Sequence, residues 1–276
     1  MQCRLPRIHK IESLPEIGTA LNDMSWEDIR KISDAGLASS YFNVGDRKAV
    51  TLNGTVGNLS LSNVTTYAFI IGFDHNASVE GANRIHFQLA KTALSGGTDV
   101  ALCDSLYNRF ASTTGYFSMN SSQTNSGGWA SSQMRTKICG TSLSSYSGTI
   151  IAVIPEALRA VLKSVTKYTD NTGGRSMASA VTATTDYFFL LSEYEVFGSI
   201  SKANSNESSK QAQYAYYSAG NSKIKYKHDG TSTAGYWWLR SPLANDSSYF
   251  VIVYSDGTVY YSLANGSIGF APCFCV

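Results

Sequence analysis

The segment Tyr249-Phe-Val-Ile-Val-Tyr-Ser-Asp-Gly-Thr-Val-Tyr-Tyr-Ser-Leu263 carries the strongest folding signal in this chain. Two runs of β-branched and aromatic residues, 249–254 and 258–263, flank Asp256-Gly257, a residue pair that favours a tight hairpin turn. We therefore predict that this segment forms an antiparallel β-hairpin.

Further strands are predicted on either side of this hairpin. Trp237-Trp-Leu239 begins one before it, and Ile268–Val276 forms one after it, beyond a second turn at Asn265-Gly266. Far upstream, Leu59–Phe73 first alternates and then becomes continuously apolar, which indicates a buried strand. Lys48–Leu52 predicts a strand that ends at a turn over the next two residues, Asn-Gly.

Helical spacing predicts several short helices. Ser25, with an acid three residues later, resembles a capping box, and Gly36 is suited to end the helix that follows. Apolar residues four apart predict a helix over Asp99–Phe110. Trp129–Cys139 indicates another short helix, and Pro155 stands where a helix can begin.

These elements predict an α+β architecture, with a few helices around an irregular antiparallel sheet and the C-terminal strands central. Asp186–Leu191 is aromatic and apolar, which predicts a central strand, whereas Gly198–Gly235 is a long polar connection. No internal repeat of 20–50 residues is visible, which argues against solenoids and propellers. We divide the chain into a leader or docking segment, 1–23, and one domain, 24–276.

The composition limits the classes of partner. The 276 residues include 22 Lys and Arg against 20 Asp and Glu, and this near balance argues against a nucleic-acid partner. No run approaches 18 apolar residues, so no membrane insertion is expected, and Met1–Ile11 lacks the apolar stretch of a secretory signal. The 17 tyrosines and the abundance of Ser, Asn and Gly are typical of adaptable binding surfaces, and also of a loop-rich protein with polar turns.

Sequence signatures of catalysis and metal binding are absent. The chain has no HExxH, GxSxG, GxxxxGK[ST] or GxGxxG motif, and its four histidines lack metal-ligand spacing. Glu193 and Glu195, two apart at a predicted strand end, have the residue types of a glycosidase pair, although two solvated acids are the favoured interpretation. We expect the five cysteines to be reduced and to fill space, and we predict neither a cofactor nor a metal.

One resemblance gives the sequence a more specific interpretation. Gly235-Tyr-Trp-Trp-Leu-Arg-Ser-Pro242, followed by Asp256-Gly257 and Asn265-Gly-Ser-Ile-Gly-Phe-Ala-Pro272, resembles a family of gut bacteria and their phages that carries the pattern WWLRSP … G … G(V/F)RP. Ser25-Trp-Glu-Asp-Ile29 is similar to the N-terminal module of that family, so the resemblance covers roughly residues 24–276. The chain departs from the pattern at Ala271, where the family has arginine.

The family is similar to C-type lectin-like folds, in the branch that includes formylglycine-generating enzymes and the variable proteins of diversity-generating retroelements. In the variable proteins, mutagenesis of adenines randomises codons near the C-terminus, and such codons yield residues such as Asn, Asp, Ser and Tyr. These residue types are frequent in 236–267 and absent from Gly269–Val276, as expected for a mutagenised window followed by an invariant tail. A sheet with one solvated face would also place polar residues of these types in alternation with apolar ones.

The resemblance implies a ligand-binding region at 236–267. Trp237, Leu239 and one alternating set within 250–253 are expected to be buried, and the tyrosines to share an exposed patch. Trp238 is equally compatible with the core, and Arg240 either bonds backbone carbonyls or is a solvated cation. The candidate ligand-binding residues are Tyr236, Trp238, Arg240, Asn245, Asp246, Ser248, Tyr249, Tyr254, Asp256, Tyr260, Tyr261 and Asn265.

The leading hypothesis is a non-enzymatic receptor or adhesin that binds a protein or glycan ligand on a cell surface. It is expected on a virion, as part of a phage tail, or on a bacterial surface, and a trimer or a virion partner would fit because avidity strengthens weak contacts. The alternatives are a formylglycine-generating-type enzyme, for which Cys273 and Cys275 are the only close cysteine pair, and an unvaried structural virion protein of the same fold.

Overall fold

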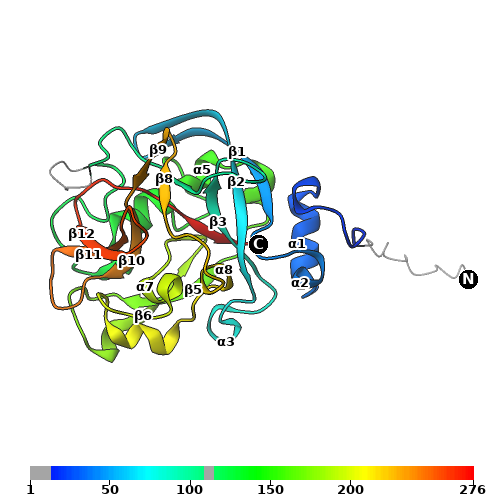
Figure 1. The fold of residues 1–276 in the computed structure, drawn as a ribbon. Helices are drawn as coiled ribbons and strands as arrows, with labels where there is room; N and C mark the ends of the chain where they lie inside the picture. The colour runs from blue at the N-terminus through cyan, green and yellow to red at the C-terminus, as the bar shows by residue number, and fades with distance from the viewer. Residues whose placement is uncertain (1–13, 109–114) are drawn as a thin grey trace, which may run out of the picture.

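The computed structural model describes residues 14–108 and 115–276 (Figure 1). Most of the predicted leader, 1–23, and the end of the helix predicted at Asp99–Phe110 lie outside these ranges. The strands are β1 (Arg47–Val56), β2 (Leu59–Phe73), β3 (Ile85–Lys91), β4 (Val100–Ala101), β5 (Val165–Asp170), β6 (Val181–Asp186), β7 (Phe188–Phe189), β8 (Lys225–Lys227), β9 (Gly230–Gly235), β10 (Trp237–Pro242), β11 (Tyr249–Val253), β12 (Val259–Leu263) and β13 (Cys273–Cys275).

The helices are short. They are η1 (Leu21–Asp23), α1 (Trp26–Asp34), α2 (Ala38–Tyr41), α3 (Ala77–Glu80), α4 (Gly128–Ser131), η2 (Met134–Cys139), α5 (Ile150–Val153), α6 (Glu156–Arg159), η3 (Ala178–Ala180), α7 (Glu193–Phe197), η4 (Ser205–Lys210) and α8 (Ala215–Ser218). Together with the strands they confirm the predicted α+β class. Among the described residues, no helix combines the length and the apolar character needed to cross a lipid bilayer.

A five-stranded sheet with the order β1-β2-β3-β13-β7 forms the centre of the molecule. The C-terminal strand β13 lies between β3 and β7, where Phe274 pairs with Phe87 on one side and Phe188 on the other. The N-terminal helix α1 packs on this sheet through Trp26, whose ring meets the rings of Phe87 and Phe274 edge-on. The two ends of the described chain therefore share one core.

Several sequence predictions are confirmed. Ser25 caps α1, because its hydroxyl oxygen accepts a hydrogen bond from the Asp28 N–H at 3.0 Å. The strand predicted at Leu59–Phe73 is β2 with the same bounds. The predicted hairpin is β11 and β12, which pair in regular register from Tyr249 opposite Leu263 to Val253 opposite Val259.

Other predictions are wrong. Within Asp99–Phe110, the described part contains the strand β4, which pairs in parallel with β8, and Leu102 forms a bridge to Phe270. Pairing with distant strands therefore overrides the helical spacing. The strand predicted at Lys48–Leu52 continues to Val56, because Gly54, with a φ of 120°, forms an irregularity in the β1–β2 register and not a turn.

The C-terminal sheet is covered on both faces. It has the order β10-β11-β12, and all four residues Phe250–Val253 are buried instead of an alternating set. Trp237 and Leu239 are buried as predicted. Because both faces of β11 are covered, only the ends of this strand, its turns and the edge strand β12 are left to contact solvent.

Candidate ligand-binding surface and the ionic cluster that holds it

Four tyrosines of the C-terminal sheet form a row of touching rings, which we call the tyrosine surface: Tyr249, Tyr254, Tyr260 and Tyr261. Tyr254 meets Tyr260 edge-on at 5.6 Å between ring centroids, and Tyr249 meets Tyr261 edge-on at 5.1 Å. Tyr260 and Tyr261 are stacked at 4.6 Å and are nearly parallel. These four tyrosines therefore lie together, as predicted, but of the four only Tyr260 is exposed and the other three are partly buried.

The register of the hairpin explains this row. Consecutive residues leave a strand on opposite faces, yet the rings of Tyr260 and Tyr261 stack on each other. Because β12 is the outer strand of its sheet, the two rings can meet only around its free edge. The row thus passes from one face of the hairpin to the other, and Tyr260 is 46% exposed at its middle.

Polar residues of the predicted site border this row. Asn245, Asp246 and Asp256 are exposed, whereas Ser248 and Asn265 are partly buried. Asn245 lies between two hollows, one of which also contains Lys202 and Tyr261 and the other Arg175 and Asp246. The loop between β10 and β11 therefore presents polar groups into two neighbouring depressions.

Three of the predicted site residues are buried and cannot form part of an exposed patch. Tyr236 lies under Tyr254, with the two rings stacked at 4.2 Å. Trp238 belongs to the core, where its indole N–H donates to the Phe117 carbonyl oxygen at 2.8 Å. Arg240 is also fully buried. The predictions of exposure for Tyr236 and Trp238 and of ligand contact for Arg240 are wrong, because distant loops cover the second face of β10.

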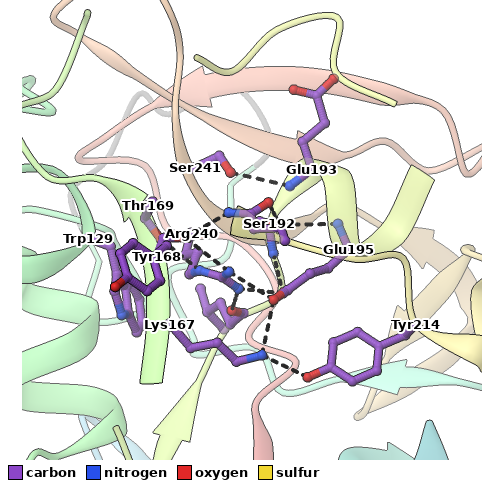
Figure 2. A network of polar contacts seen from close by, with 12 residues as sticks. Trp129, Lys167, Tyr168, Thr169, Ser192, Glu193, Glu195, Tyr214, Arg240 and Ser241 are labelled. Carbon is purple, nitrogen blue, oxygen red and sulfur yellow. Dashed lines mark hydrogen bonds and ion pairs between the residues drawn. The ribbon is translucent and has the colours of Figure 1, made fainter. Parts of the chain in front are cut away.

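Arg240 instead forms the centre of a buried ionic cluster, which comprises Glu80, Lys167, Glu195 and Arg240. Figure 2 shows Lys167, Glu195 and Arg240 of this cluster. Its guanidinium binds both carboxylate oxygens of Glu195 and donates to the Leu190 carbonyl oxygen at 2.8 Å. It also donates to the Thr169 hydroxyl at 2.8 Å. The alternative that Arg240 bonds backbone carbonyls is thus confirmed, and these contacts tie β10 to α7 and β5.

Lys167 extends this cluster. Its ammonium donates to Glu80 at 2.6 Å, to Glu195 at 3.0 Å and to the Tyr214 hydroxyl at 2.8 Å. Burial alone would raise the pKa of Glu195, but Arg240 and Lys167 outweigh it and hold that pKa well below its usual range. Glu195 is therefore ionised in the folded protein.

The same place has the donor types of a metal site. Single ligand atoms of His75, Glu80 and Glu195 lie within 4.8 Å of one another. However, the Lys167 ammonium already bridges the two carboxylates, and Arg240 adds a second cation. A divalent ion would meet repulsion from both. The geometry therefore favours a structural ion-pair network, in which burial lowers the pKa of His75 to about 3 and keeps its ring neutral.

Glu193 and Glu195 do not form a solvated pair at a strand end, as the sequence suggested. Both are buried in the helix α7, which begins with a capping box formed by Ser192 and Glu195. The Glu193 carboxylate accepts hydrogen bonds from the backbone N–H groups of Ser201 and Ala203 at 2.6 and 2.7 Å. One acid therefore holds Arg240 and the other holds the loop that follows α7.

The cysteines described by the structure are buried and unbonded to one another, as expected for space-filling thiols, and Cys3 lies outside the described residues. Burial raises the pKa of Cys275 to about 12 and that of Cys273 well above its usual value. Both thiols are thus protonated and shielded at neutral pH, so this geometry gives no support to the enzyme alternative.

The cluster could hardly be predicted from the sequence. Glu80, Lys167 and Tyr214 come from segments far apart in the chain, and none belongs to a recognisable motif. Arg240 and Glu195 stand out in the sequence, but nothing there indicates that they are partners. The available signal was an arginine inside an otherwise apolar strand, since a charge in such a position needs a buried partner.

Comparison with known proteins adds one assignment. Residues 107–276 match a family described as a domain of unknown function, DUF6273, and the chain belongs to this family. No curated protein and no solved structure matches the chain.

Arg240→Met is expected to lower the free energy of unfolding by roughly 3–5 kcal/mol, because it leaves Glu195 charged and buried without its main partner. The double variant Arg240→Met/Glu195→Gln should lose less than the sum of the two single losses, since it removes both charges. Denaturant unfolding of all four proteins measures this difference. Additive losses would show that the two residues do not act as a pair.

Glu207→Gln is expected to change the pH dependence of stability. Burial raises the pKa of Glu207 to about 7, from an unfolded value near 4.5. Between these values the folded state binds more protons than the unfolded state, so the wild-type chain loses stability as the pH rises. Between about pH 5 and about pH 8, the free energy of unfolding of the variant should therefore rise by roughly 1–3 kcal/mol relative to that of the wild-type chain.

Parallel denaturant titrations of the wild-type and Glu207→Gln proteins measure this shift. Groups present in both proteins, such as His75 and Glu80, cancel in the comparison as long as the substitution does not alter their own titration. A stability difference that stays constant over this range would contradict a raised pKa at Glu207.

Proposed function

We propose that this protein is a non-enzymatic binding protein whose tyrosine surface, with the loop at Asn245 and Asp246, contacts the ligand. The observation that carries the proposal is the row of four tyrosine rings around the free edge of β12. Tyrosine provides a large and rigid contact area at low entropic cost, and it is enriched among the residues that dominate binding energy.

The separation of core and surface supports a second part of the proposal. Strand β11 contributes four consecutive buried residues, while the polar residues of Asn245–Ser248 and of the Asp256 turn lie at its two ends. Substitutions at such exposed positions usually change stability by less than about 0.5 kcal/mol. The surface can therefore be rewritten while the core is kept, which is what diversification by a retroelement requires.

We accordingly propose a C-type lectin-like variable protein diversified within 236–267, acting as a receptor or adhesin on a phage tail or a bacterial surface. Its ligand is a protein or glycan on a cell surface, and a trimer or a virion partner would supply avidity. The buried subset of this window, which includes Tyr236, Ser241 and Ser262, is expected to vary least, because its members contact the core.

The direct test is the sequence of sister genes. Adenine-specific differences should concentrate at Asn245, Asp246, Tyr249, Tyr254, Tyr260 and Tyr261, with an invariant tail over 268–276. A template repeat and a reverse-transcriptase gene should lie nearby. Sister genes that are identical throughout 236–267, or that vary equally in the tail, would contradict diversification.

A binding measurement separates recognition from diversification. A library randomised at these six positions, which are exposed or partly buried, and displayed on phage should yield binders to whole bacterial cells. A matched library randomised at Phe250, Val251, Ile252 and Trp238 should yield none, because these residues form the core. Enrichment from neither library would contradict a binding role for the tyrosine surface.

A further inference from the structure

The hollow beside Tyr261, which we call the Lys202 pocket, has a more specific chemistry than the rest of the surface. Its volume is about 480 Å³, and its walls include Ser176, Lys202, Ser205, Asn245 and Tyr261. Sites for small molecules usually enclose roughly 300–1,000 Å³. The pocket is thus large enough for part of a ligand that also contacts the tyrosine surface.

Lys202 differs from most of the buried lysines of this protein. Lys91, Lys163 and Lys167 each form an ion pair with a carboxylate. Within the described ranges, no carboxylate forms an ion pair with Lys202, whose ammonium instead lies 5.8 Å from the centre of the Tyr261 ring. A half-buried cation beside an aromatic ring has lost part of its hydration and is suited to bind an anion from outside.

The pocket is held by rigid backbone. The Glu193 carboxylate accepts hydrogen bonds from the N–H groups of three successive residues, 201–203, and so fixes the loop that carries Lys202. On the opposite wall, Asn245 has a left-handed backbone with a φ of 62°, and its side-chain oxygen accepts a hydrogen bond from the Ser176 hydroxyl at 2.9 Å. A preformed site loses little conformational entropy when a ligand binds.

The remaining wall groups define the rest of the ligand. The hydroxyls of Ser176 and Ser205 and the amide of Asn245 are groups that can form hydrogen bonds with ligand hydroxyls, and the ring of Tyr261 can pack against the apolar face of a sugar ring. A second cation, Arg175, lies in the adjoining hollow on the other side of Asn245, together with the carboxylate of Asp246. A ligand that carries a negative charge on successive units can reach both Lys202 and Arg175 across this loop, and Asp246 weakens the attraction at the second unit.

We propose that the Lys202 pocket binds the carboxylate of an acidic oligosaccharide of the uronic-acid type. This inference rests on the proposed function, since it specifies a ligand class for the same surface. The carboxylate pairs with the Lys202 ammonium, the sugar ring stacks on Tyr261, and the next acidic unit extends toward Arg175.

The test uses trigalacturonate and an uncharged trisaccharide, maltotriose, in calorimetric titrations of the full chain. Trigalacturonate should bind, with an affinity that falls as salt is added, and maltotriose should bind at least about tenfold more weakly. Lys202→Ala should reduce the affinity for trigalacturonate by about tenfold or more. Failure of trigalacturonate to bind at millimolar concentration would overturn the proposal.

Lys223→Ala is the matched control. Lys223 is also half-buried over an aromatic ring, that of Phe197 at 5.6 Å, but it does not line the pocket. Its substitution should leave the affinity within about twofold, and an equal loss in both variants would show only a general charge effect. If hexaglutamate binds through Lys202 and trigalacturonate does not, the ligand is an acidic peptide, and the proposal of a saccharide ligand is wrong.

Failure of this inference can be distinguished from failure of the proposed function. If trigalacturonate does not bind while the displayed surface library still yields binders to cells, the tyrosine surface is a binding surface for other ligands. If neither binds, both proposals are wrong.

Discussion

The buried ion pair between Arg240 and Glu195 is the interaction on which the arrangement of the C-terminal sheet depends. Arg240 lies on β10, and Glu195 lies in the helix α7, far upstream in the chain. The bidentate contact, together with the bonds from Arg240 to Leu190 and Thr169, joins the sheet to the helix α7 and the strand β5. A charge buried this deeply has few alternative positions, so the pair fixes the position of β10.

From that fixed strand the surface follows. β10 positions β11, and the regular register of β11 with β12 places the tyrosine rings in one row. The second acid of α7, Glu193, holds the loop beside Tyr261, so one helix supports both the sheet and the neighbouring pocket. The residues that would contact a ligand are therefore separate from the residues that hold the fold. This separation is the physical condition for changing recognition without refolding.

Local patterns in the sequence were sufficient for the elements of this region, and long-range packing was not visible in them. The hairpin at Asp256-Gly257, the Ser25 cap and the strand Leu59–Phe73 follow from turn chemistry and periodicity, which are local. The burial of Trp238 and Arg240 was not predictable in this way, because it depends on Phe117 and Glu195, which approach from distant segments. Similarly, the helical spacing of Leu102 gave the wrong element, since strand pairing with β8 and Phe270 decided its conformation.

A rigid core in this protein carries surface side chains that can be exchanged. The most direct measurement is the stability, by pooled proteolysis, of a library randomised together at Asn245, Asp246, Tyr249, Tyr254, Tyr260 and Tyr261. Most members should remain folded, with a free energy of unfolding within about 2 kcal/mol of the parent. A library in which most members unfold would contradict this expectation, because the tyrosine row would then be part of the core.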